Sequence, residues 1–248
     1  LHGAIEREEF SLAYQPLLHA HQGEPPAIEA LLRWHRPGIG YCSPAEFIPI
    51  AEKCGEIVRI GDWVLNEACR QATAWDRAGL RFDRIAVNVS AVQFFNSDLV
   101  AEFTRAQQDF GLARGALHVE LTESSLMRKP AQAMQTMQRL HEQGISVSLD
   151  DFGTGYSSMS YLQHLPLDIL KIDRSFVADV ETNPRNASIC RALLSLGHSM
   201  GLTIIAEGVE TPGQLDWLAA HGCDQVQGYL LGRPAPLERI IDALDEAS

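Results

Sequence analysis

Acidic and amide side chains stand at or near the carboxyl ends of several apolar segments in this sequence. Each segment is a short run rich in Val, Ile and Leu, which is typical of a buried strand. The polar residues at these positions are Glu29, Asn88, Glu120, Asp150, Lys171, Glu207 and Gln227. Where parallel strands lie side by side, such residues converge, and four clustered carboxylates need a cation because like charges raise each other's pKa. Oxygen-rich clusters suit Mg²⁺ or Mn²⁺ rather than Zn²⁺.

Each of these residues has a simpler explanation when it is taken alone. A lone Glu at a strand end more often caps the next helix or faces solvent. Arg33 and Lys171 alone are equally compatible with ordinary ion pairs. The whole set, at the same end of separate strands, favours the convergence that a two-metal hydrolase requires.

Asp150 and Asp151 are adjacent, and neighbouring residues of a strand point to opposite faces unless the strand has ended. The FGTGYSS segment that follows contains Gly153 and Gly155, which permit a tight turn. We expect this turn to let both carboxylates reach one pair of metals. The alternative is an ordinary loop in which one Asp caps the next helix.

Strand-like and helix-like segments alternate along the chain from residue 85 onward. The expected strands span residues 85–90, 117–124, 145–152, 168–173, 202–210 and 223–231. Helix-like segments span residues 97–110, 130–144 and 186–201, and the last two end in Gly, as helices often do. Repeated βα units over about 250 residues predict an α/β fold, a TIM-type (β/α)₈ barrel, with a doubly wound open sheet as the alternative.

Two further strand candidates precede these units. They span residues 10–18 and 27–34 and are separated by the turn-prone segment HQGEPP. This arrangement predicts a hairpin, which would leave one strand near the N-terminus antiparallel in an otherwise parallel barrel.

Composition limits the class of protein. The formal net charge of −12 disfavours nonspecific binding to a nucleic acid polymer. The absence of a long apolar run predicts no membrane contact by this segment, and five scattered cysteines without CxxC spacing argue for reduced cytoplasm over a disulfide framework or zinc site. We expect residues 1–248 to form a single domain, and the first residue, Leu rather than Met, indicates a segment of a longer protein.

Short motifs along nearly the whole chain resemble those of the EAL family of cyclic di-GMP phosphodiesterases. The family is named for the string that begins EALLRW at Glu29. A three-residue string alone recurs by chance, but the ordered set is specific. The remaining motifs are YQP, FIPIAE, NVS, ELTES, DDFGTGYSS, LPLDILKIDRSFV, AEGVET and QGYLLGRP.

The resemblance implies roles for individual residues. Two divalent cations, Mg²⁺ or Mn²⁺, would be held by Glu29, Asn88, Glu120, Asp150 and Asp151, with Asp150 bridging them. Lys171 resembles the lysine that positions or activates the attacking water, and Glu207 and Gln227 resemble residues that hold metal-bound waters. Lys171, Glu207 and Glu29 are therefore the expected catalytic residues, with the general base left open. Arg33 resembles the arginine that meets a substrate phosphate and Gln15 a contact near the guanine, while Glu123 resembles a glutamate that supports the loop after Asp151.

The implied activity is metal-dependent hydrolysis of cyclic di-GMP to linear pGpG by metal-activated water. The family also implies a homodimer that uses residues 156–165 and, in the full-length chain, an upstream sensor or cyclase-like domain that could anchor the protein to a membrane. One alternative is a catalytically silent cyclic di-GMP receptor. A more distant one is another metal-dependent barrel enzyme that forms an enolate with Lys171 as the base.

Overall fold

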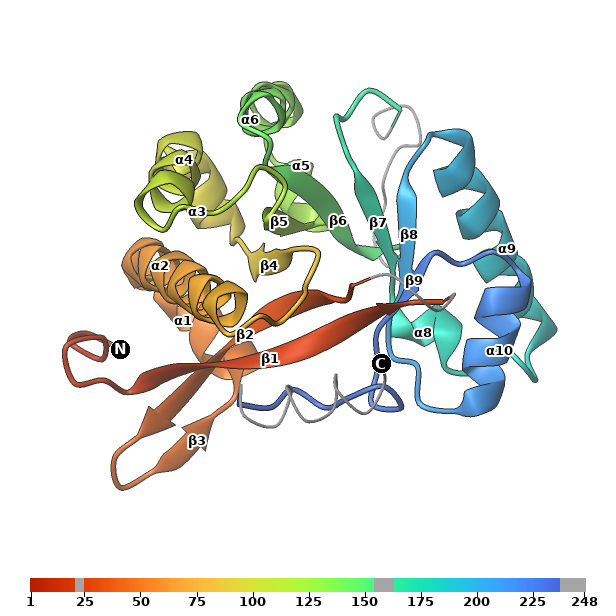
Figure 1. The fold of residues 1–248 in the computed structure, drawn as a ribbon, viewed down its shortest axis with the longest axis horizontal. Coiled ribbons are helices and arrows are strands. Elements are labelled where there is room, and N and C mark those ends of the chain that lie inside the picture. Colours follow the sequence, from red (N-terminus) through yellow and green to blue (C-terminus); the bar gives the residue numbers. More distant parts are fainter. Residues whose placement is uncertain (21–24, 154–162, 237–248) are drawn as a thin grey trace.

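The computed structural model describes residues 1–20, 25–153 and 163–236. Its strands form one sheet in the order β1-β9-β8-β7-β6-β5-β4-β2-β3, and an additional pairing between β1 and β2 closes eight of them into a barrel (Figure 1). The strands are β1 (Phe10–His19), β2 (Ala27–Arg36), β3 (Gly40–Cys42), β4 (Ile85–Asn88), β5 (Leu117–Thr122), β6 (Ser146–Phe152), β7 (Ile169–Ile172), β8 (Thr203–Ala206) and β9 (Gln225–Val226). The predicted barrel is confirmed, and the open-sheet alternative is wrong because the sheet closes.

Strand β1 is the antiparallel member of the barrel. It pairs antiparallel with β2 over eight residue pairs and with β9 over two. From β2 through β4 to β9, neighbouring barrel strands pair in parallel. The predicted N-terminal hairpin and its antiparallel strand are therefore confirmed.

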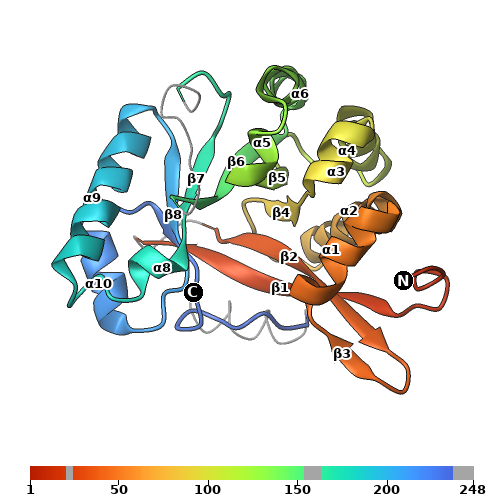
Figure 2. The same cartoon turned by 180° about the vertical axis from the view of Figure 1, so that it is seen from behind.

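Helices cover the outside of the barrel. Helices α1, α2, α4 and α6 lie along one side, and α9 and α10 along the other (Figures 1 and 2). The helices are α1 (Pro44–Cys54), α2 (Glu56–Arg77), α3 (Ala91–Asn96), α4 (Leu99–Asp109), α5 (Glu123–Leu126), α6 (Pro130–Glu142), α8 (Arg174–Val177), α9 (Pro184–Ser199) and α10 (Pro212–Ala220). The expected helices are confirmed with slightly different ends, and Gly144 and Gly201 follow α6 and α9 with positive φ.

An apolar layer inside the barrel supports the polar residues above it. Leu17, Ala27, Ile169 and Ile205 form a separate buried cluster contributed by β1, β2, β7 and β8. Each lies two residues from a polar residue on the same strand, and side chains two apart point to the same face. The polar partners are Gln15, Glu29, Lys171 and Glu207, the last just beyond its strand. They therefore form the next layer of the interior, toward the carboxyl ends of the parallel strands.

The structure corrects several expected positions. Glu29 is the third residue of β2 and does not stand near its carboxyl end, because β2 continues past its pairing with β4, which ends at Ala30, and forms a ribbon with β1 and β3. Glu123 begins α5 rather than extending β5, and β9 has only two residues before the chain turns at Gln227. The five cysteines are free, and no helix of the described segments is long and apolar enough to cross a bilayer.

Candidate active site

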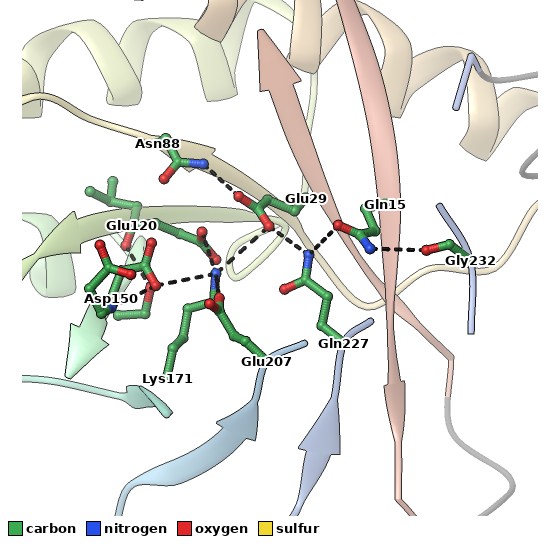
Figure 3. A network of polar contacts seen from close by, with 12 residues as sticks. Gln15, Glu29, Asn88, Glu120, Asp150, Lys171, Glu207, Gln227 and Gly232 are labelled. Carbon is green, nitrogen blue, oxygen red and sulfur yellow. Dashed lines mark hydrogen bonds and ion pairs between the residues drawn. The ribbon is translucent and has the colours of Figure 1, made fainter. Parts of the chain in front are cut away.

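Lys171 lies at the centre of the polar layer, surrounded by four carboxylates (Figure 3). Its Nζ lies 2.8 Å from Glu120 Oε2 and 2.7 Å from Glu207 Oε1. Glu29 Oε2 and Asp150 Oδ1 lie slightly farther away, at 3.7 and 3.8 Å. The side chain is only 1% exposed, so these charges interact with little screening by water. The ammonium group is the positive charge that faces these four acidic side chains.

Glu29 is held by two amides that donate to opposite oxygens. Asn88 Nδ2 donates to Oε1 at 2.6 Å, and Gln227 Nε2 donates to Oε2 at 2.6 Å. Gln227 Nε2 also lies 3.1 Å from Gln15 Oε1, and Gln15 Nε2 donates to the carbonyl of Gly232 at 2.9 Å. Hydrogen bonds thus link strands β4, β2 and β1 to the segment after β9, as Figure 3 shows.

The four carboxylates are not electrostatically equivalent. Burial raises the pKa of Glu29, but Lys171 and the two amides outweigh it and leave the pKa below its usual value. Burial dominates at Glu120, and neighbouring carboxylates add to it, so its pKa is well above the usual range despite Lys171. Burial also raises the pKa of Glu207 to about 8, with Asp150 and Glu29 acting in the same direction. Burial opposes the charge of Lys171, yet the surrounding carboxylates raise its pKa well above the usual value.

Asp150 and Asp151 both belong to β6, which spans nearly the same residues as the expected strand 145–152. The pairing of β6 with β7 changes register between Leu149 and Phe152, and Asp151 has a φ of 55°. A bulge with a left-handed residue re-aims side chains that regular alternation would send to opposite faces. The site therefore depends on this bulge in β6, and the Gly155 of the expected turn lies outside the described residues.

The carboxylates fit a divalent cation. Ligand oxygens of Asp150, Asp151 and Glu207 lie within 4.8 Å of one another. Glu120 Oε1 and Gln227 Oε1 are buried without a hydrogen-bond partner among the described residues. Buried oxygens without a donor are costly unless a water or ion satisfies them. Clustered acceptors with unused lone pairs are what Mg²⁺ and Mn²⁺ coordinate.

Two cavities flank this cluster and share Glu29 and Leu31 in their walls. The larger, about 380 Å³, also contains Arg33 and Asn88 and extends over apolar residues of α1 and α2. The smaller, about 210 Å³, has in its wall Gln15, Asp150, Glu207 and Gln227. The structure therefore places the predicted substrate contacts Arg33 and Gln15 in different cavities, on either side of Glu29.

Glu123 lies where it can support the segment that follows Asp151. It is 4% exposed, and its Oε2 accepts a hydrogen bond from the backbone N–H of Gly153 at 3.3 Å. Gly153 has a φ of 95°, a conformation that favours glycine. The contact fixes the end of β6 two residues after Asp151.

Three residues in the wall of the smaller cavity were missed by the sequence-based prediction: Arg174, Glu210 and Tyr229. Each lies two or three residues after a predicted site residue, in the segment that follows a barrel strand. Loops at the carboxyl ends of barrel strands carry the functional groups of such enzymes. Continuing two or three residues beyond each strand end would have found them.

The raised pKa of Glu207 predicts how stability depends on pH when metal is chelated. Folded Glu207, with a pKa of about 8, binds a proton more tightly than in the unfolded chain, where its usual value is 4.5. The stability that this proton contributes is present at low pH and is lost as the pH rises toward 8. We expect this contribution to the thermal stability of the chelated domain to be lost between about pH 4.5 and about pH 8.

A Glu207→Gln variant is the control for this prediction, because the neutral amide has no proton to lose. Thermal denaturation of both proteins in chelator should show a shallower fall for the variant. Equal slopes for the two proteins would assign the pH dependence to other groups.

Comparison with known proteins places the chain in a family. A family model described as the EAL domain matches residues 1–234. The bifunctional diguanylate cyclase/cyclic di-GMP phosphodiesterase MucR of Pseudomonas aeruginosa is 44% identical over 241 residues, 97% of this chain and 35% of that protein. The cyclic di-GMP phosphodiesterase NbdA of the same organism is 43% identical over 244 residues, 98% of this chain and 31% of that protein.

Solved structures agree with the sequence comparison. The PaMucR phosphodiesterase in complex with c-di-GMP has a TM-score of 0.91 at 44% identity, and the match covers 96% of this chain and 97% of that one. The chain spans about a third of the length of the two curated relatives. Sequence, fold and the arrangement of acidic residues at the barrel mouth lead to one conclusion: this chain belongs to the EAL domain family.

Proposed function

We propose that this chain hydrolyses cyclic di-GMP to linear pGpG in a reaction that requires two divalent cations, Mg²⁺ or Mn²⁺. The observation that carries the proposal is the cluster of four carboxylates around Lys171, with unpartnered buried oxygens, between two cavities. The likeness to relatives named as cyclic di-GMP phosphodiesterases supports the same substrate.

The residues that would hold the two cations are Glu29, Asn88, Glu120, Asp150 and Asp151. When bound, the cations lower the pKa of a water molecule and offset the charge of the attacking and leaving oxygens. The buried oxygens of Glu120 and Glu29 face the same small volume as Lys171 Nζ, which supports this assignment. Asn88 contributes through its Oδ1, since its Nδ2 donates to Glu29.

Lys171, Glu207 and Glu29 are proposed as the catalytic residues. Lys171 stays protonated, because the surrounding carboxylates raise its pKa, and it therefore orients an oxygen as a donor. Glu207, with a pKa of about 8 before metal is bound, can exchange a proton near neutral pH. Gln227 holds Glu29 and offers a buried oxygen to water.

Substrate contacts are proposed on both sides of this cluster. Arg33, in the larger cavity, would meet a phosphate through its planar guanidinium group, and Gln15, in the smaller one, would lie near a guanine. Because the two cavities share Glu29 and Leu31, we expect the scissile bond to lie between the two contacts.

The purified domain with Mg²⁺ or Mn²⁺ and cyclic di-GMP tests the proposal, with a chelated sample as the control. Metal-dependent appearance of pGpG is the expected result. Tight binding of cyclic di-GMP without turnover would instead make the chain a receptor. Absence of both binding and turnover would contradict the proposal and favour the alternative of a different metal-dependent barrel enzyme.

Replacement of Glu123 by Gln tests its proposed role in supporting the loop. The variant keeps the shape of the side chain but weakens the hydrogen bond from Gly153, because a neutral acceptor replaces a charged one. We expect the Mn²⁺ concentration needed for half-maximal hydrolysis to rise about tenfold, by analogy with lost outer-shell contacts in other metal sites. If the variant has a lower Tm but the same metal requirement as the wild type, Glu123 stabilises the fold and does not contribute to metal binding.

A homodimer and cytoplasmic location are also proposed, on the sequence alone. The segment expected to lie near the partner, residues 156–165, falls outside the described residues except for its last three. Light scattering over a range of concentrations distinguishes a dimer from a monomer. An upstream sensor or cyclase-like domain stays a prediction.

A further inference from the structure

Arg174 introduces a positive charge into a cavity wall that is otherwise acidic. It is the first residue of α8, three positions after Lys171, and it lines the 210 Å³ cavity. The acidic side chains of the same wall are those of Glu29, Asp150, Glu207 and Glu210, and Arg174 is the sole Lys or Arg among the described residues there. A positively charged side chain beside this cluster can stabilise the negative charge of a bound phosphate.

The backbone and Cβ of Arg174 are fixed against the loop that carries Glu207. A Cβ added to Gly208, whose φ is 71°, would lie 2.4 Å from the Cβ of Arg174 and 3.3 Å from its Cα. Gly208 is therefore the residue that permits this close approach. The turn around Arg174 is further held because Asp173 Oδ1 accepts from Ser175 N at 3.0 Å, and Arg174 O accepts from Ala178 N at 2.9 Å.

The guanidinium group of Arg174 has no hydrogen bond or close ion pair within the described parts of the chain. Some exposed arginines, in contrast, do pair: Arg59 with Glu6, and Arg70 with Glu67. Burial raises the pKa of Asp151, and the positive charge of Arg174 is one of the influences that oppose this rise. The donors of the guanidinium group are therefore available to a ligand in the cavity that Arg174 lines.

We propose that Arg174 binds the phosphate that is seated at the carboxylate cluster, while Arg33 binds the other phosphate of the dinucleotide. The inference rests on the proposed function. A cyclic dinucleotide has two phosphodiester groups, and the two cavities that share Glu29 each contain one arginine. Five donors in a planar fork suit a phosphate better than a lysine does. The linear product has a terminal phosphate with more charge, so it depends on Arg174 more strongly.

Three variants test the assignment. Arg174→Met removes the charge and keeps an unbranched apolar side chain, whereas Arg174→Lys keeps the charge. Arg185→Met, at an exposed position of α9, is the matched control. Calorimetric titration with cyclic di-GMP and with pGpG, in chelator and at several salt concentrations, measures affinity apart from turnover. We expect Arg174→Met to weaken pGpG binding about tenfold or more, with a smaller loss for cyclic di-GMP. Arg174→Lys should recover part of the affinity, and Arg185→Met should have no effect.

The salt dependence separates a phosphate contact from a structural role. Loss of a charged contact should make affinity less sensitive to salt, whereas loosening of the loop should not. Wild-type affinity and salt dependence in Arg174→Met would overturn the proposal, as would a loss that accompanies a lowered Tm and is not recovered by Lys. If the wild-type domain binds the ligands without hydrolysing them, the proposed catalysis fails, and these affinities still decide the role of Arg174.

Discussion

Replacing Lys171 with Met is expected to abolish hydrolysis and to make folding of the domain depend on added metal. The variant leaves Glu29, Glu120, Asp150 and Glu207 without the ammonium group that lies between 2.7 and 3.8 Å from each. Breaking a buried ion pair on one side typically costs about 3–5 kcal/mol of stability. Activity should fall by about 10²- to 10³-fold or more, as when other preorganised donors are removed.

Thermal denaturation in chelator and in excess Mn²⁺ measures the structural part of this effect. The Tm of Lys171→Met should drop strongly in chelator and recover in part with metal, because a divalent cation replaces the lost positive charge. The matched control is Lys53→Met, at the exposed end of α1, which should change neither Tm nor activity. A chelated Lys171→Met domain as stable as the wild type would show that the carboxylates do not depend on Lys171.

Replacing Glu120 with Gln should eliminate metal-dependent turnover without destabilising the chelated domain. Glu120 is 1% exposed, and burial holds its pKa well above the usual range, so a neutral amide resembles the protonated acid. The substitution also removes one of the like charges near Glu29 and Asp150. We expect an equal or higher Tm in chelator and at least about a hundredfold weaker Mn²⁺ binding, since a charged ligand is lost.

The two substitutions therefore have opposite expected effects on stability and the same effect on activity. Calorimetric titration with Mn²⁺ gives the metal affinity, and Glu142→Gln, at the end of α6, is the control for loss of a carboxylate elsewhere. Mn²⁺ affinity like that of the wild type in Glu120→Gln would remove Glu120 from the proposed ligands. A large fall in Tm would show that its charge supports the fold.

The sequence was sufficient to predict the barrel, its N-terminal hairpin and the end of the barrel at which the polar residues gather. Glu120 and Lys171 lie near the ends of apolar runs, and parallel pairing in a closed barrel brings such positions to one mouth. The predicted hairpin was recognisable because a turn-prone segment separates two apolar runs. Fold class and the convergence of the polar residues followed from these patterns, and residue roles came from the family resemblance.

Local backbone geometry was not predictable in the same way. The bulge in β6 depends on a left-handed φ at Asp151. This conformation is uncommon for residues other than glycine, so the sequence pattern of the strand does not predict it. The start of α5 at Glu123 and the brevity of β9 are likewise set by packing beyond the segment itself. Arg174 was missed because its place in the cavity depends on the turn after β7 and on its close approach to Gly208.

Closure of the barrel rests on a short seam between β1 and β9. Only two residue pairs join these strands, whereas eight join β1 to β2. Contacts across the seam connect residues about 200 positions apart, such as Gln15 with Gln227, and Tyr14 with Ala235. Such distant contacts carry the largest loop-closure entropy and form late in folding. Because Gln227 also holds Glu29, the proposed active site is completed only when the two ends of the sheet join, and a partly folded chain should therefore lack it.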